Sequence, residues 1–241
     1  MLSAKADMIR RLRADILIRQ GLQKIPGNPA MDMGLGAINR AFPGNQFPLA
    51  AVHEFVCTNA ENKTASAGFI AALVSSLMKQ GKPCLWVSTN RHFFPPALTA
   101  FGIDPSRIVF MDLVRDKEIL WVMEEALKCD SLCAVIADIR NLDFTASRRL
   151  QLAVEQSKTT GFILRQTNHL NTTACVSRWR ISPVASYLRT GMPGIGYPRW
   201  HIELLKIRNG QPGHWTLEWR NRKFKEIAID HPMLEAARKI V

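Results

Sequence analysis

The stretch from residue 52 to residue 65 constrains the fold of this chain most strongly. A short apolar strand, 52–57, runs into a tight turn, then into Lys63-Thr64 and a helical segment. This layout is typical of the phosphate-binding loop G-x-x-x-x-G-K-[ST], in which a buried strand leads into a helix. Cys57 and Asn62 stand where the two glycines of that motif belong. The stretch therefore predicts an α/β fold whose loop has lost the residues that let a backbone wrap a phosphate.

The pattern after residue 51 predicts how the core is built. Apolar strand-like runs at 52–57, 83–88, 107–113, 132–138 and 161–166 alternate with helical segments at 63–79, 95–101, 116–128 and 145–158. Near-continuous apolar strands suit a parallel sheet that helices cover on both faces. We therefore expect a doubly wound α/β core with its site at the carboxyl ends of the strands.

Both ends of the chain read differently from this core. Residues 1–26 predict a basic amphipathic helix, and the Gly- and Pro-rich residues 27–50 predict a linker. After Thr167, strand-like segments at 175–184, 200–208 and 214–221 indicate an antiparallel hairpin that extends the sheet. We therefore expect residues 51–227 to form the core with its β extension, and residues 228–241 a helical tail.

Charge indicates the class of partner. The chain carries 32 Lys+Arg against 20 Asp+Glu, a net charge of +12. This balance favours nucleic acid, ahead of an anionic membrane, over the alternative of a merely well-solvated basic surface. No apolar run approaches a membrane span, and the charged N-terminus does not read as a signal peptide. Five cysteines without C-x-x-C spacing predict no metal site and fit the reducing cytoplasm.

The candidate nucleotide site is incomplete. In a working loop Lys63 and Thr64 would reach the phosphates and Mg²⁺, and Asp138, at the end of a later apolar strand, would hold the metal through water. Glu61, however, places negative charge where phosphate would bind at the helix N-terminus. Asn90 stands after the second strand, where a base would have to take a proton from water. We expect no cofactor, and an internal ion pair of Lys63 with Glu61 or Asp138.

Without catalytic residues, function must lie on surfaces. Basic residues interleaved with aromatic ones in the C-terminal strands fit single-stranded DNA, because cations neutralise phosphates and aromatic rings stack on bases. The candidate DNA-binding residues are Arg178, Arg180, Arg189, Arg199, Arg208, Arg220, Arg222 and Lys223. Strand alternation predicts that Arg178 and Arg180 face solvent together while Trp179 faces the core. We expect at least half of the tryptophans to be core residues.

A second candidate surface is the apolar stripe of the N-terminal helix. Leu12, Ile16 and Leu17 lie on one helical face, which fits either self-association into a homo-oligomer or docking of a partner. Docking of this helix on its own core is an equally good alternative.

Several segments resemble RecA-fold proteins and, more closely, the ImuA family of bacterial error-prone repair proteins. The resemblance covers roughly residues 1–225 and is carried by 47–55, 95–98, 101–104, 161–166, 177–181, 204–210, Trp215 and Trp219. It implies a RecA-like fold in which Gln166, at the end of the fifth core strand, matches the residue that senses nucleotide in RecA. Lys63 and Thr64 also match, whereas Cys57, Asn62 and Asn90 depart from the RecA pattern.

The resemblance also implies a function. ImuA-like proteins act without catalysis in damage-induced (SOS) translesion synthesis, beside ImuB, which is an inactive Y-family polymerase relative, RecA and an error-prone DNA polymerase. By this reading the chain is a nucleoid-associated cytoplasmic accessory protein of that assembly. The alternatives are a DNA-stimulated P-loop ATPase and a SulA-like cell-division inhibitor, and the remnant Lys63-Thr64 speaks against the latter.

Overall fold

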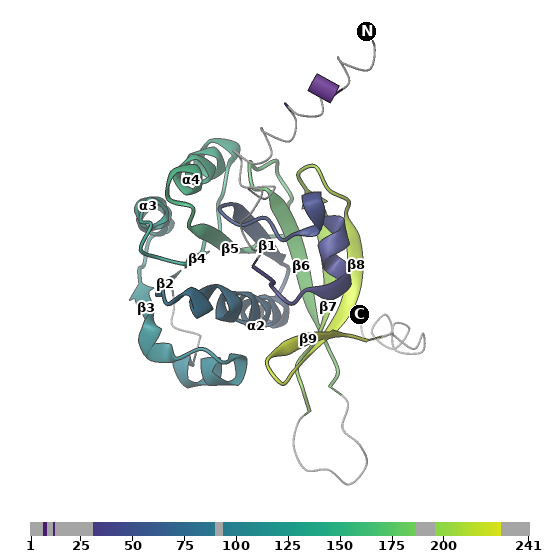
Figure 1. Cartoon of the computed structure of the whole chain (residues 1–241). Coiled ribbons are helices and arrows are strands. Elements are labelled where there is room, and N and C mark those ends of the chain that lie inside the picture. The colour runs from purple at the N-terminus through teal and green to yellow at the C-terminus, as the bar shows by residue number, and fades with distance from the viewer. Residues whose placement is uncertain (1–6, 9–11, 13–30, 90–93, 187–195, 228–241) are drawn as a thin grey trace.

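The computed structural model describes residues 7, 8, 12, 31–89, 94–186 and 196–227. In this part of the chain a nine-stranded sheet has the order β3-β2-β4-β5-β1-β6-β7-β8-β9 (Figure 1). Its parallel strands are β1 (Val52–Cys57), β2 (Cys84–Ser88), β3 (Ile108–Asp112), β4 (Ala134–Asp138), β5 (Thr160–Gln166) and β6 (Ser177–Val184). The antiparallel strands are β7 (Arg199–Ile207), β8 (Gly213–Arg220) and β9 (Lys223–Glu226). The expected mostly parallel sheet with an antiparallel C-terminal extension is confirmed.

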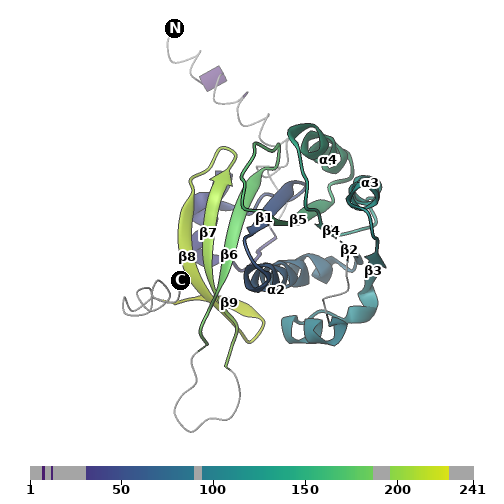
Figure 2. The same ribbon diagram turned by 180° about the vertical axis from the view of Figure 1, so that it is seen from behind.

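Helices cover both faces of the parallel half. The long helix α2 (Ala60–Leu77) lies on one face, and α3 (Asp116–Leu127) and α4 (Phe144–Ser157) lie side by side on the other (Figures 1 and 2). Short 3-10 helices connect the elements: η1 (Gly36–Ala41), η2 (Pro43–Asn45), η3 (Met78–Gln80), η4 (Pro95–Phe101) and η5 (Pro105–Arg107). The segment 95–101, expected as a helix, is thus a 3-10 turn that begins with two prolines.

Aromatic rings form the centre of the core on the α2 side. Phe55 of β1 and Trp179 of β6 stack with their ring centroids 5.9 Å apart, and Phe69 of α2 lies 6.1 Å from Trp179. Trp86, Trp179, Trp200 and Trp219 are all buried, so the prediction for the tryptophans is confirmed. Burial of this much aromatic surface ties α2 to the junction between the parallel and antiparallel halves.

Helix α3 shows how the apolar spacing of the sequence sets its packing. Ile119, Met123 and Leu127 recur every four residues, share one face of the helix and are buried against the sheet. Helix α2 differs, because its central residues 69–74 are all buried. It packs against the sheet and η4, and its Phe69 also contacts Phe224 of β9, so it is not half-exposed like α3.

The prediction that residues 27–50 form a linker is wrong for residues 31–50, which are the part of this segment that the structure describes. Residues 31–50 pack onto the α2 face of the sheet, and Leu35, Ile38 and Phe42 belong to the core. The amide of Gln211 donates to the carbonyl of Ala41, which joins this segment to the β7–β8 turn. Glycines and prolines here shape a tight chain path that buries its apolar side chains instead of spacing two domains.

Some expectations fall outside the described residues. The residues concerned, which lie outside the part of the chain that the structure describes, are Ile16, Leu17, Asn90, Arg189 and the tail 228–241. Met8 and Leu12 are helical and exposed. Within the described parts of the chain no helix is both long and apolar enough to span a membrane.

Candidate functional site

The start of helix α2 decides whether a phosphate can bind. The helix begins at Ala60 and not at the expected residue 63, so only Thr58 and Asn59 connect it to β1. The Oδ1 of Asn59 accepts a hydrogen bond from the amide of Asn62 at 2.8 Å, as a helix N-cap. The amide of Lys63 donates to the carbonyl of Asn59 at 3.1 Å. Two amides that would face a phosphate are therefore used within the helix.

The missing glycines explain why the chain takes this path. Neither Cys57 nor Asn62 adopts a left-handed backbone, and the side-chain amide of Asn62 donates to the hydroxyl of Thr58 at 3.0 Å. Cys57 ends β1 and its thiol lies 3.4 Å from the hydroxyl of Ser66. Burial raises the pKa of the Cys57 thiol, so it remains protonated.

The Lys63 ammonium is bound inside the protein. It donates to Oδ2 of Asp138, whose side chain is only 5% exposed. The predicted ion pair is therefore confirmed, with Asp138 rather than the exposed Glu61 as partner. The other oxygen of Asp138, Oδ1, is buried and has no hydrogen-bond partner among the described residues. The hydroxyl of Thr64 donates to the carbonyl of Ala60 at 3.0 Å.

All six predicted nucleotide-site residues lie at the carboxyl edge of the parallel strands. Gln166 ends β5 directly opposite Cys57 of β1, and it is exposed. What the arrangement lacks is an open backbone cradle and a free lysine. Among the described residues no group of three or more His, Cys, Asp or Glu side chains is placed to hold a metal ion.

A buried charge cluster lies on the opposite face of the sheet. Glu54 of β1 is fully buried, and its Oε1 accepts from NH1 of Arg165 at 2.9 Å. Its Oε2 accepts from Nε of Arg178 at 2.8 Å and from the hydroxyl of Thr173 at 2.9 Å. The expectation that Arg178 faces solvent is wrong, because the segment after β5 folds over it and Glu54 neutralises it.

The same cluster fastens the segment that follows β5. Arg178 also donates to the carbonyl of Asn171 at 2.6 Å. Lys206 donates to the carbonyl of Thr173, and Arg208 donates to that of Ala174, each at 2.9 Å. The guanidinium of Arg208, another DNA-binding candidate, thus binds the protein backbone. Sequence patterns did not reveal this arrangement, because the partners are brought together only by the strand order.

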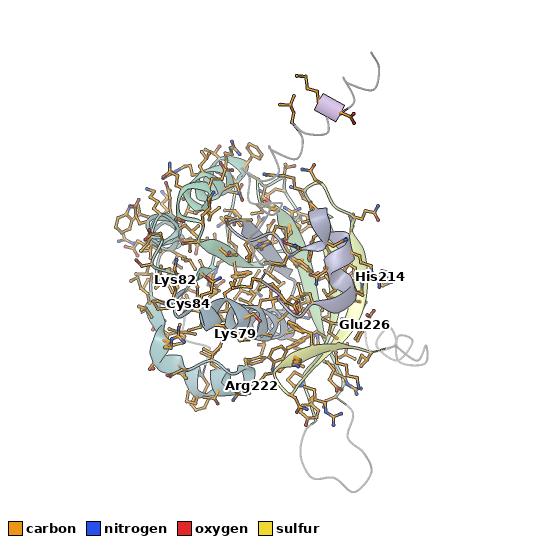
Figure 3. The ribbon with its side chains drawn as sticks, viewed as in Figure 1. Lys79, Lys82, Cys84, His214, Arg222 and Glu226 are labelled. Carbon is orange, nitrogen blue, oxygen red and sulfur yellow. The ribbon has the colours of Figure 1, made fainter. Side chains whose placement is uncertain are left out.

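The remaining cationic candidates divide into paired and unpaired ones. Arg180 pairs with Glu203 at 3.4 Å, and Arg199 pairs with Glu218 at 2.7 Å. Arg220, Arg222 and Lys223 are exposed, and no carboxylate of the described residues pairs with them. Figure 3 shows Arg222 at the turn between β8 and β9. Among the predicted DNA-binding residues that the structure describes, the exposed cations without a carboxylate partner thus lie at this end of β8 and β9.

A groove of about 650 Å³ opens beside the first turns of α2. Glu61, Thr64 and Gly68 of α2 form one side, and Phe101 of η4 and the segment 196–200 face them. Its lining is predominantly apolar. No sequence pattern indicates this groove, since its walls come from segments far apart in the chain.

Known proteins similar to this chain were found by sequence and by structure. No protein-family model matches. The chain is 32% identical over 203 residues to the protein named "Protein ImuA" of Caulobacter vibrioides strain NA1000 / CB15N, covering 79% of this chain and 83% of that protein. The values are the same for "Protein ImuA" of strain ATCC 19089 / CIP 103742 / CB 15. A solved structure, "Crystal structure of the RadB recombinase", superposes with a TM-score of 0.55 at 15% identity, over 82% of this chain and 100% of that chain.

Proposed function

The chain belongs to the ImuA family, and on this premise we propose that it is a non-catalytic, RecA-fold accessory protein of translesion DNA synthesis. One observation carries the non-catalytic part of the proposal. The first turn of α2 and the ion pair of Lys63 with Asp138 lie where the phosphates of a nucleoside triphosphate would bind in a working phosphate loop. The protein then acts through contacts with other macromolecules.

Electrostatics opposes nucleotide binding at this place. A phosphate would have to draw Lys63 away from Asp138 and leave a carboxylate that is 4% exposed without its partner. Breaking a fully buried pair in this way costs about 3–5 kcal/mol, and less here because the Lys63 side chain is 25% exposed. The carboxylate of Glu61 would also repel the phosphate.

Equilibrium titration with a fluorescent ATP analogue, with and without Mg²⁺, tests the proposal. We expect no saturable binding below millimolar concentration and no turnover with single-stranded DNA present. Lys79→Ala, in the 3-10 turn that follows α2, is the matched control for Lys63→Ala. Sub-millimolar binding that Lys63→Ala abolishes and Lys79→Ala retains would instead make the chain a DNA-stimulated ATPase.

The partners of the proposed assembly are an ImuB-like polymerase relative, RecA and an error-prone DNA polymerase. Support comes from the N-terminal helix, where Met8 is 66% and Leu12 is 55% exposed. Residues four positions apart share one face of a helix, so these two exposed apolar side chains are available together for a partner to cover. Contact between copies of this chain through the same helix is part of the proposal.

Co-precipitation with each purified partner tests this surface. Leu12→Asp should reduce capture of at least one partner, or reduce the mass in multi-angle light scattering if copies associate. Leu170→Asp, at an exposed loop position, is the control. Unchanged capture and unchanged mass for Leu12→Asp would remove the helix from the proposed interface.

Direct contact with single-stranded DNA completes the proposal. Its support is the net charge of +12 and the cluster of Arg220, Arg222 and Lys223, which have exposed side chains. Arg178 and Arg208 no longer belong to this surface because they hold the segment after β5.

A further inference from the structure

We propose that the groove beside α2 receives an unpaired base of single-stranded DNA, while Arg220, Arg222 and Lys223 hold the neighbouring phosphates. The inference rests on the DNA contact proposed above and assigns it to a place in the fold. It makes the apolar groove and the adjacent cations two halves of one binding surface.

The walls of the groove suit a flat ring. Tyr197 is 42% exposed and Phe101 is partly exposed, so both offer aromatic surface. Phe101 stacks on the buried Trp200, with ring centroids 6.5 Å apart and planes 22° apart, which fixes its orientation. A Cβ at Gly68 would lie 3.4 Å from Trp200 and 3.5 Å from Phe101, so a larger residue there would fill the floor. Base–aromatic stacking is tolerant of sequence, as a general single-strand binder requires.

The unpaired cations are placed against these same walls. The guanidinium of Arg220 lies 5.0 Å from the ring centroid of Tyr197, within the range of a cation–π contact. The Arg222 stem passes the residue after Phe101, since a Cβ built at Gly102 would lie 3.0 Å from Cδ of Arg222. Positive φ at Asn221 and Arg222 turns the chain there and brings Lys223 to the same end of the sheet. A base in the groove would therefore have cations beside its backbone.

Charge selects nucleic acid over other occupants. An apolar peptide would fill the groove but leave Arg220 and Arg222 without counter-charges, whereas a DNA strand supplies both a ring and phosphates. A free nucleotide has the ring, but the ammonium that would bind its phosphates is already paired with Asp138. Glu61 forms part of the α2 side of the groove and is the one acidic residue among the described residues that line it. Its carboxylate should weaken DNA binding.

Fluorescence of 2-aminopurine in a single-stranded oligonucleotide, measured with the full-length protein, tests the proposal. Stacking in the groove should quench the fluorescence of this base. A strand of the same length that lacks every base should bind roughly 5- to 100-fold more weakly. This comparison uses the unaltered protein, so it does not depend on how a variant folds. Tyr197→Ala should weaken the base-containing strand by a similar factor and leave affinity for the abasic strand unchanged.

Two further variants test the groove by filling it and by removing its negative charge. Thr64→Phe, at an exposed position of α2, should fill the groove and abolish quenching, whereas Glu61→Gln should tighten binding by a few-fold at low salt. Trp121→Ala removes an aromatic ring that is 62% exposed on α3, far from the groove, and should change nothing. A thermal unfolding curve for each variant confirms that the fold is retained.

Each other outcome overturns the proposal in a recognisable way. Equal affinity for both strands, weakened only by removing Arg220 or Arg222, would mean that phosphates alone are bound, so the DNA contact would stand and the groove assignment would fail. No binding of single-stranded DNA by the unaltered protein would remove both. Displacement of the oligonucleotide by micromolar ATP would assign the groove to free nucleotide. Loss of ImuB-like partner binding in Thr64→Phe, with DNA binding intact, would assign it to a peptide.

Discussion

Glu54 is a fully buried carboxylate held by two arginines, and its neighbours define the first prediction at the scale of single residues. Glu54→Gln keeps the size of the side chain but leaves Arg165 and Arg178 without their counter-charge. We expect the free energy of unfolding to fall by about 3–5 kcal/mol in urea titrations. Glu203→Gln, which breaks the half-exposed pair with Arg180, is the control and should cost about 0–1 kcal/mol. Similar losses for both variants would show that burial does not strengthen the cluster.

His53 makes stability depend on pH. Burial lowers the pKa of His53 from 6.5 to about 3, partly offset by the hydrogen bond that its Nε2 donates to the carbonyl of Pro48. Its Nδ1 accepts from the hydroxyl of Ser177 at 2.6 Å, which also requires the neutral ring. The unfolded chain therefore binds more protons than the folded one between pH 6.5 and pH 3, so this contribution is complete above pH 6.5 and is lost as the pH falls.

Urea unfolding at pH 7 and pH 5 measures the effect of His53. At about 1.36 kcal/mol per pH unit below 6.5, this histidine should remove roughly 2 kcal/mol of stability over that interval. His53→Gln should lose this part of the pH dependence, whereas His169→Gln, at an exposed loop position, should retain it. An unchanged slope in His53→Gln would assign the pH dependence to other groups.

A sequence motif predicts the ion pair of Lys63 with Asp138, whereas no pattern predicts the pair of Glu54 with Arg178. Lys63, in the first turn of α2, and Asp138, at the end of β4, stand at positions that the phosphate-loop pattern already brings to the same edge of the sheet. Glu54 and Arg178 are separated by 124 residues, and no motif relates them. Alternation along a strand predicts which face a side chain lies on. It does not predict whether another segment covers that face, and this is why Arg178 was expected in solvent.

At the scale of elements, the N-cap of α2 determines where the helix begins. Asn59→Ala removes the side-chain acceptor for the amide of Asn62 and should lower the free energy of unfolding by about 1 kcal/mol. Asn59→Gly, which keeps a good N-cap backbone, should lower it by only a few tenths. Urea titration of both variants checks the difference. Equal losses would indicate that the Asn59 side chain does not stabilise the helix start.

The elements could be predicted where one physical pattern dominates. The strands of the parallel half are apolar runs bounded by polar residues, and they were placed to within a few residues. The motif predicts a loop up to residue 62, but α2 begins at Ala60, because Asn59 is a strong N-cap and Ala60 a strong helix former. Glycines and prolines in residues 31–50 predict a linker, but apolar side chains between them are buried once the sheet has formed, and the sequence pattern does not indicate this.

At the scale of the whole molecule, the distribution of paired and unpaired charge predicts how DNA binding responds to salt. If Arg220, Arg222 and Lys223 contact three phosphates, the logarithm of the single-strand affinity should fall with the logarithm of salt concentration with a slope of about −2. Fluorescence anisotropy at several salt concentrations measures the slope. Removing Arg222 should reduce its magnitude by about 0.7.

The control for this prediction is Arg180→Gln, because Arg180 pairs with Glu203. It should leave the slope nearly unchanged. If Arg180→Gln flattened the slope as much as Arg222→Gln, the binding surface would extend over the middle of the antiparallel strands and not only over their end.

The ion pair between Lys63 and Asp138 has a consequence for timing in the cell. RecA-type proteins change state as they bind ATP, hydrolyse it and release the products, and this cycle limits how long each state lasts. Under the proposed function, a chain in which Lys63 is paired with Asp138 has no such cycle, so the ATP level of the cell should not alter its behaviour. Under the proposed function, how much of the protein is made and how quickly it is degraded would set the duration of its activity.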